Sequence, residues 1–208
     1  MASDTESRTG WARSARVESP LTLLREYLIA LRALLAGEQV STDGRYIQLD
    51  KVMLGWPPTT APAIVAAAAG PRTLRLSGEF ADGTVLDSSI TLDGLRQARR
   101  LVDEGRAGAG RTGPHPLIVY LRAMTGADAR DRLAKEIFEG SVQPDSAVVA
   151  GDAAAIAAAI GSWADAGADT VVLHSARLGD VRRDDLPAHH GVRAGEGLDR
   201  SRAVVGRR

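Results

Sequence analysis

The sequence predicts an α/β fold in which helices alternate with strands of a parallel sheet, and three observations support it. Residues 61–69 form an uninterrupted apolar run without two-residue alternation, which is typical of a strand covered on both faces. The run stops at Gly70-Pro71, and proline suits the first turn of a helix. Further apolar runs then alternate with amphipathic segments, which favours parallel β/α units.

The composition bounds the function before any motif does. At 208 residues one domain is expected, and 26 basic residues balance 26 acidic ones, so nothing recommends nucleic acid or an anionic membrane as a partner. The absence of cysteine excludes a disulfide framework, a thiolate nucleophile and a thiolate metal site. Because no apolar stretch approaches the roughly 20 residues that span a bilayer, and the N-terminus lacks a signal-peptide core, we expect a soluble, cytoplasmic protein.

For the first part of the chain, the sequence predicts a flexible N-terminal segment, here called the lead, followed by a helix and a hairpin. Residues 1–18 are polar and lack apolar periodicity, so we expect them to be flexible. Ser19 is a suitable N-cap, and a proline and leucines at three- and four-residue spacing follow it up to Gly37. A core-facing helix is therefore expected there, followed by a small hairpin that turns at Asp43-Gly44.

The Gly70-Pro71 turn is the candidate site. Gly70 can adopt backbone angles closed to other residues and leaves its amide uncovered, while the free amides and the dipole of the following helix can hold a phosphate. Arg72 and Thr73 can add a charge and a hydroxyl. On spacing alone, a helix start without a ligand is the simpler interpretation.

The remaining elements continue the alternation. We expect a second buried strand at 84–86 and then a helix that is capped by Thr91 and ends between Gly105 and Gly113. A third strand at 116–121 and a charged helix at 128–138 follow. An alanine-rich helix, capped by Asp152 and ended by Gly167, then leads to a fourth strand at 168–174.

Residues 67–86, Ala-Ala-Ala-Gly-Pro-Arg-Thr-Leu-Arg-Leu-Ser-Gly-Glu-Phe-Ala-Asp-Gly-Thr-Val-Leu, resemble the segment that identifies the luciferase-like monooxygenase superfamily. The similarity is closer to the branch that uses the deazaflavin coenzyme F420 and includes methylenetetrahydromethanopterin reductase. Residues 23–49 and 166–173 resemble the same family. The resemblance implies a monooxygenase or reductase, an oxidoreductase that uses coenzyme F420 or FMN and acts on a small organic substrate.

The resemblance also implies a site. In the family, the Gly-Pro turn after the fifth barrel strand holds the cofactor phosphate through backbone amides, which here implies contacts from Ala69, Gly70, Pro71 and Arg72. The family's ring contacts and catalytic acid or base lie mostly on the first four strands, which have no counterpart in this sequence. No catalytic residue is therefore assigned.

A strand count limits the predicted fold. A closed barrel has eight strands over roughly 250 residues, whereas we expect four core strands here. The resemblance covers the family's C-terminal half. We therefore predict a partial (β/α)8 TIM barrel at 19–176, with about four C-terminal parallel β/α units and the N-terminal half missing. Residues 177–208 are polar and unlike the family's closing helix, so a disordered tail is expected.

Two functions remain open. One is a flavin- or deazaflavin-dependent oxidoreductase completed by another chain; the other is a non-catalytic half-barrel remnant that folds or dimerises without turnover. An open half-barrel exposes two strand edges and an apolar face. A homodimer, or completion by another chain, is therefore expected in either case.

Both histidine candidates have simpler interpretations. His174 ends the last strand at the face where ligands bind, so it could contact a substrate or transfer a proton, but a structural hydrogen bond is the simpler role. His189-His190 has no third ligand at a recognisable spacing, so no metal site is predicted.

Other polar candidates lie near the expected strands. Asp82 and Glu79 flank a turn, where capping or an ion pair with Arg75 is more consistent than acid–base chemistry. Because alternate residues of a strand point to opposite faces, we expect one of Tyr120 and Arg122 to face the cofactor side.

Overall fold

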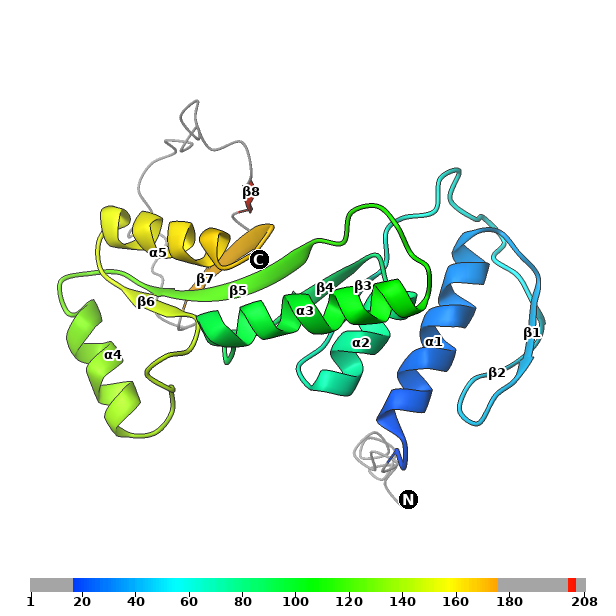
Figure 1. Ribbon diagram of the computed structural model, residues 1–208, viewed down its shortest axis with the longest axis horizontal. Helices are drawn as coiled ribbons and strands as arrows, with labels where there is room; N and C mark the ends of the chain where they lie inside the picture. Colours follow the sequence, from blue (N-terminus) through cyan, green and yellow to red (C-terminus); the bar gives the residue numbers. More distant parts are fainter. Residues whose placement is uncertain (1–16, 176–201, 205–208) are drawn as a thin grey trace, which may run out of the picture. The chain divides into compact units, whose positions relative to one another are not determined.

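The computed structural model describes residues 17–175 and 202–204 (Figure 1). The chain divides into two compact units, residues 1–61 and 62–208. No helix of the described residues is long and apolar enough to cross a membrane.

The first unit contains the predicted helix and hairpin. Helix α1 spans Pro20–Leu35, and its N-cap Ser19 accepts a hydrogen bond from the Thr22 N–H through its side chain. Strands β1 (Val40–Asp43) and β2 (Gln48–Val52) pair antiparallel. Both elements are confirmed, and Gly37 takes the positive φ of +81° that favours glycine after a helix.

A carboxylate of α1 holds the hairpin turn. The side chain of Glu26 accepts hydrogen bonds from three consecutive backbone N–H groups, those of Arg45 at 3.0 Å, Tyr46 at 2.8 Å and Ile47 at 3.0 Å. These bonds lower the pKa of the Glu26 carboxyl because they favour its charged form. The turn and α1 therefore stabilise one another within this unit.

The second unit is a parallel sheet with helices between its strands. Its strands are β3 (Val65–Ala67), β4 (Gly83–Leu86), β5 (Leu117–Met124), β6 (Val148–Ala150), β7 (Thr170–Ser175) and β8 (Arg202–Val204). Its helices are α2 (Pro71–Phe80), α3 (Leu92–Gly108), α4 (Ala129–Phe138) and α5 (Ala153–Asp165). The strand order is β3-β4-β5-β7-β8, and every pair is parallel.

Strand β6 was not predicted, and its place follows from the register of β5. It pairs with residues 122–124 of β5. One edge of β5 is already paired with β7 as far as Ala123, so β6 must lie on the other edge. Strand β6 therefore lies on the same edge of β5 as β4, beyond the end of β4. Strand β8 falls within the tail that we expected to be disordered. Residues 177–201 and 205–208 of that tail, which include His189-His190, lie outside the described residues. Residues 1–16 of the predicted lead also lie outside them.

The core lies on one face of this sheet, between it and α2, α3 and α5. Buried side chains from the strands and helices form it together: Leu74, Leu86, Leu95, Leu101, Val102, Leu117, Val119, Leu121, Trp163 and Val171. Leu95 of α3 and Trp163 of α5 both belong to this cluster, so both helices cover the same face of the sheet. On the opposite face, Val65 is 41% exposed and Tyr120 is 40% exposed.

The prediction that residues 61–69 are covered on both faces is wrong. Burial alternates along this segment: Ile64, Ala66 and Ala68 are buried, while Val65 and Ala67 are exposed. Among the described strands, β3 pairs only with β4, and it presents one face to the core. Alanine fits both kinds of face, so the alanine run gave no two-residue signal.

Candidate functional site

The Gly70 turn lies at the C-terminal end of β3. Gly70 is the N-cap of α2, and Pro71 occupies its first position. The Leu74 N–H donates to the Gly70 carbonyl at 2.9 Å and closes the first helical turn. The structure brings the four predicted contact residues together here, and Ala69, Gly70, Pro71 and Arg72 are all exposed.

Gly70 does not adopt the unusual backbone conformation expected of it. Its φ of −86° and ψ of 159° are open to any residue. Its N–H donates to the Thr73 hydroxyl at 3.1 Å, and that hydroxyl donates to the Gly70 carbonyl at 2.9 Å. An added Cβ would approach only Thr73 Oγ1, at 3.8 Å. Neither the backbone angles nor the packing within the chain therefore requires glycine at this position, and its lack of a side chain leaves the neighbouring amides uncovered.

Fewer backbone N–H groups at this turn are free to bind a phosphate than the sequence suggested. Proline has no N–H, and the Gly70 N–H is already bonded to Thr73, which leaves the amides of Arg72 and Thr73 at the second and third helical positions. Within residues 17–175, these two amides donate to no other group of the chain. Two adjacent amides, the positive helix end and the Arg72 guanidinium are a donor set that fits a phosphate group.

Asp87 is an acidic neighbour that sequence reasoning missed. The register Ala67↔Val85, continued two residues along both chains, places Asp87 beside Ala69. Its Oδ1 accepts from the Ser89 N–H at 2.9 Å and from the Ser89 hydroxyl. The signal was available, since polar residues directly follow a buried strand at the end where α/β proteins bind ligands. A carboxylate here weakens the attraction for an anion.

Tyr120 and Arg122 both lie on the face opposite the core helices. The prediction that only one of them faces that side is wrong, because residues two apart in a strand share a face. The burial of β5 confirms it: Leu117, Val119 and Leu121 are buried against the helices. Arg122 pairs in register with His174 of β7, so these side chains are neighbours on the same face.

Two contacts organise this face near the C-terminal ends of the strands. The rings of Tyr120 and His174 lie 6.0 Å apart between centroids, tilted by 60°. The Arg122 guanidinium bonds Glu136 of α4 at 2.5 Å, and the two side chains are 18% and 19% exposed. His174 thus contacts an aromatic ring, and its proposed proton transfer stays a prediction.

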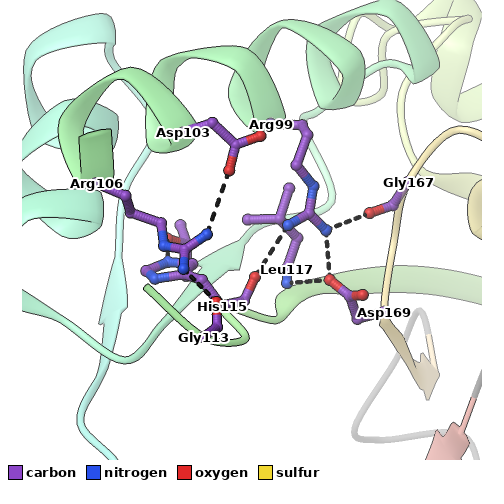
Figure 2. Close-up of polar contacts among 9 residues, drawn as sticks. Arg99, Asp103, Arg106, Gly113, His115, Leu117, Gly167 and Asp169 are labelled. Atoms are coloured by element: carbon purple, nitrogen blue, oxygen red, sulfur yellow. Dashed lines mark hydrogen bonds and ion pairs between the residues drawn. The ribbon is translucent and has the colours of Figure 1, made fainter. Parts of the chain in front are cut away.

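A polar network at the opposite end of the sheet, where β5 and β7 begin, was also missed (Figure 2). Arg99 of α3 donates to the His115 carbonyl at 2.9 Å, to the Gly167 carbonyl at 2.8 Å and to Asp169. The Asp169 carboxylate also accepts from the Leu117 N–H at 2.8 Å. These bonds join α3 to the starts of two strands, so the network is structural.

His115 is buried next to this network. Its Nε2 is 2.8 Å from the Thr84 hydroxyl, which is 2.7 Å from the Ser77 hydroxyl. Burial, together with the charges of Arg106, Arg99 and Arg111, lowers the pKa of His115 to about 4. The ring is therefore neutral at pH 7. His115 precedes β5, so it lies at the end of the sheet opposite the C-terminal strand ends.

Structural roles account for the carboxylates near the second strand. Arg75 pairs with Glu104 of α3 at 2.8 Å, a carboxylate on another helix. Asp82 accepts from the Ile64 N–H at 2.9 Å and from Arg111 at 2.7 Å. In the described part of the chain, no group of three histidine, aspartate or glutamate side chains could hold a metal ion.

Comparison with known proteins identifies the family. The model of the luciferase-like monooxygenase family matches residues 2–168, and the chain belongs to this family. It is 35% identical over 94 residues to a 5,10-methylenetetrahydromethanopterin reductase of Methanolobus tindarius, and 34% identical over 95 residues to the reductase of that name from Archaeoglobus fulgidus. It is 31% identical over 100 residues to an F420-dependent hydroxymycolic acid dehydrogenase of Mycobacterium tuberculosis.

These matches cover part of each relative. The aligned segments take in 45–48% of this chain, but only 26–28% of the three relatives. The chain therefore matches less than a third of the length of these proteins.

Solved structures agree on the fold. The coenzyme F420 dependent tetrahydromethanopterin reductase of Methanopyrus kandleri superposes with a TM-score of 0.59 at 19% identity, over 78% of this chain and 59% of that one. An F420-dependent secondary alcohol dehydrogenase, solved with an F420-acetone adduct, gives a TM-score of 0.67 at 17% identity, over 74% and 56% of the chains. The parallel α/β fold is therefore shared with these solved structures.

Proposed function

We propose that this chain binds the phosphate of coenzyme F420 or FMN at the Gly70 turn and belongs to an oxidoreductase that uses this cofactor. The observation that carries the proposal is the pair of adjacent amides, Arg72 and Thr73, at the start of α2 on the exposed C-terminal end of β3. The names of the relatives and solved structures favour F420. FMN remains a candidate because it also presents a phosphate group at the end of its ribityl chain.

The chain's own residues have a defined part in this function. The amides of Arg72 and Thr73 would bind phosphate oxygens, and the Arg72 guanidinium would add a charge-assisted hydrogen bond. A phosphate held at this point orients the rest of the cofactor over the C-terminal ends of the strands. When bound, the cofactor supplies the redox chemistry: hydride transfer with F420 or oxygenation with a flavin.

We further propose that the described sheet is part of a barrel completed by another chain or a second copy. The half-exposed face that carries Val65 and Tyr120 supports this, as do the partial matches to relatives. A remnant that folds or dimerises without turnover is the second candidate, because no catalytic residue is assigned in this chain. Sedimentation of the purified chain separates a monomer from a dimer, and turnover in the presence of F420 or FMN separates the two functions.

The binding proposal is tested by replacing Gly70. Both Gly70→Asp and Gly70→Asn fit the observed backbone angles and the open space beside Thr73. Both side chains cap the free amides and thereby preserve α2, but only Asp adds a negative charge. We expect Gly70→Asp to weaken F420 and FMN binding at least tenfold in a fluorescence titration, and Gly70→Asn to weaken it less.

The control is thermal unfolding, which should show both variants at least as stable as the parent chain. If Gly70→Asp binds either cofactor as tightly as the parent, the phosphate is held elsewhere. Failure of the parent chain to bind F420 and FMN would refute the proposed function for this chain.

A further inference from the structure

The parallel register places Tyr120 level with the Gly70 turn on one face of the sheet. Ala67, Val85 and Ile118 are partners in successive pairs, so they form one row across β3, β4 and β5. Two residues further along each strand, the row passes through Ala69 and Tyr120. With about 4.8 Å between neighbouring strands, the Cα atoms of these two residues are about 10 Å apart.

Tyr120 and His174 form a tilted pair of rings, here called the aromatic corner, on that face. Tyr120 is 40% exposed although it lies in the middle of a strand with buried neighbours, and its ring is tilted by 60° to that of His174. A tilted pair leaves one aromatic face open to a third ring in offset or edge-to-face contact. A half-exposed aromatic corner beside a polar edge fits a flat, polycyclic ligand with hydrogen-bonding groups at its rim.

Arg122 supplies the polar edge. Glu136 holds its guanidinium in place, and the ion pair is mostly shielded from solvent. Because the pair is neutral overall, Arg122 positions a ligand more than it attracts one. A guanidinium has five N–H donors, so Arg122 can donate to a ring carbonyl while it remains paired with Glu136.

We infer that Tyr120, His174 and Arg122 form the binding site for the tricyclic ring of the cofactor whose phosphate lies at the Gly70 turn. The inference rests on the proposed function. It assigns ring contacts to β5 and β7, in the chain itself. A ribityl chain that joins phosphate to ring would have to bridge the distance of about 10 Å between the Gly70 turn and Tyr120.

The two halves of the site are tested with separate probes. Riboflavin carries the flavin ring without the phosphate, and inorganic phosphate carries no ring. We expect Tyr120→Leu and His174→Leu each to weaken riboflavin binding at least fivefold and to leave inorganic phosphate binding unchanged. Gly70→Asp should do the reverse. Phe138→Leu, which replaces an aromatic that is 92% exposed on α4, is the matched control and should change neither.

A spectroscopic readout reports ring contact directly. Stacking on Tyr120 should quench flavin fluorescence when FMN binds to the parent chain, and Tyr120→Leu should remove most of that quenching at saturating FMN. Arg122→Lys, which retains the charge but not the planar fork, should lower FMN affinity without removing the quenching.

The outcomes separate the two claims. If Tyr120→Leu and His174→Leu bind riboflavin and FMN like the parent chain while Gly70→Asp loses FMN, the ring site is wrong and the proposed function stands. If the parent chain binds inorganic phosphate but not riboflavin, the ring site is also wrong. If it binds neither F420, FMN nor inorganic phosphate, the proposed function and the ring site both fail.

Discussion

Gly105 of α3 lies against the main-chain carbonyl of Arg75 in α2, and a Cβ added to Gly105 would stand 2.0 Å from that oxygen. The contact is reciprocal one turn away, because a Cβ on Gly78 of α2 would stand 2.1 Å from the Val102 carbonyl of α3. The two glycines allow the backbones of these helices to approach closely. This close approach fixes α2, and with it the Gly70 turn, against the core.

Alanine at either glycine should therefore destabilise the second unit. We expect Gly78→Ala and Gly105→Ala each to lower the free energy of unfolding by about 3 kcal/mol, because the neighbouring atom is backbone and the helices must move apart. Gly161→Ala in α5 is the matched control, since its Cβ meets nothing within 4 Å. It should raise stability by about 0.5–1 kcal/mol in chemical denaturation. Equal effects at all three positions would contradict this account.

His115 makes stability depend on pH in a defined window. Its pKa in the folded chain is lowered to about 4 from the usual 6.5. Between these values the unfolded chain binds a proton that the native state does not, so stability is complete above pH 6.5 and declines as the pH falls towards 4. The decline amounts to at most about 3 kcal/mol. Denaturation of His115→Gln across this range should show a correspondingly smaller slope; an unchanged slope would contradict the assignment.

Local chemistry explains which parts of the fold could be predicted from the sequence. Ser19, Thr91 and Asp152 are N-caps as expected, and each side chain accepts a hydrogen bond from an amide three residues along. Such caps depend only on adjacent residues. The hairpin at Asp43-Gly44 and the positive φ of Gly167 follow from the same short-range rules.

The parts that could not be predicted depend on distant partners. Arg75 pairs with Glu104 on another helix, where sequence spacing had suggested closer carboxylates. Strand β6 has three residues and forms where β5 offers a vacant edge beyond β4. At the candidate site, the helix start was predictable, but the bond between Gly70 and Thr73 that removes one of its amides was not.

Glu26 should control the hairpin turn in the first unit. Because its carboxyl has a lowered pKa, the stabilisation is present above the unfolded value of about 4.5 and is lost as the pH falls through the folded value. Glu26→Gln places an amide nitrogen where one of the backbone N–H donors needs an acceptor. We expect faster hydrogen exchange at the amides of Arg45, Tyr46 and Ile47 in this variant. Glu38→Gln, at an exposed position outside this cluster, should leave those amides protected.

Asp169 should be more important to stability than its 48% side-chain exposure suggests. Its carboxylate accepts from the N–H of Leu117, a fully buried residue at the start of β5, and from Arg99 (Figure 2). Asp169→Ala leaves that N–H without its acceptor, so we expect a loss of about 1–3 kcal/mol.

Asp169→Asn retains an acceptor oxygen and should lower the free energy of unfolding less than Asp169→Ala does. Because Arg99 and Asp169 share one network, Arg99→Ala combined with Asp169→Ala should lower it by less than the sum of the two single changes. Arg96→Ala on the same helix, whose partner Asp93 is 94% exposed, should stay within about 0.5 kcal/mol of the parent chain. Urea denaturation of the parent chain and the five variants measures these differences. If the losses of unfolding free energy at Arg99 and Asp169 were additive, each residue would act alone. The starts of β5 and β7 would then depend on separate contacts.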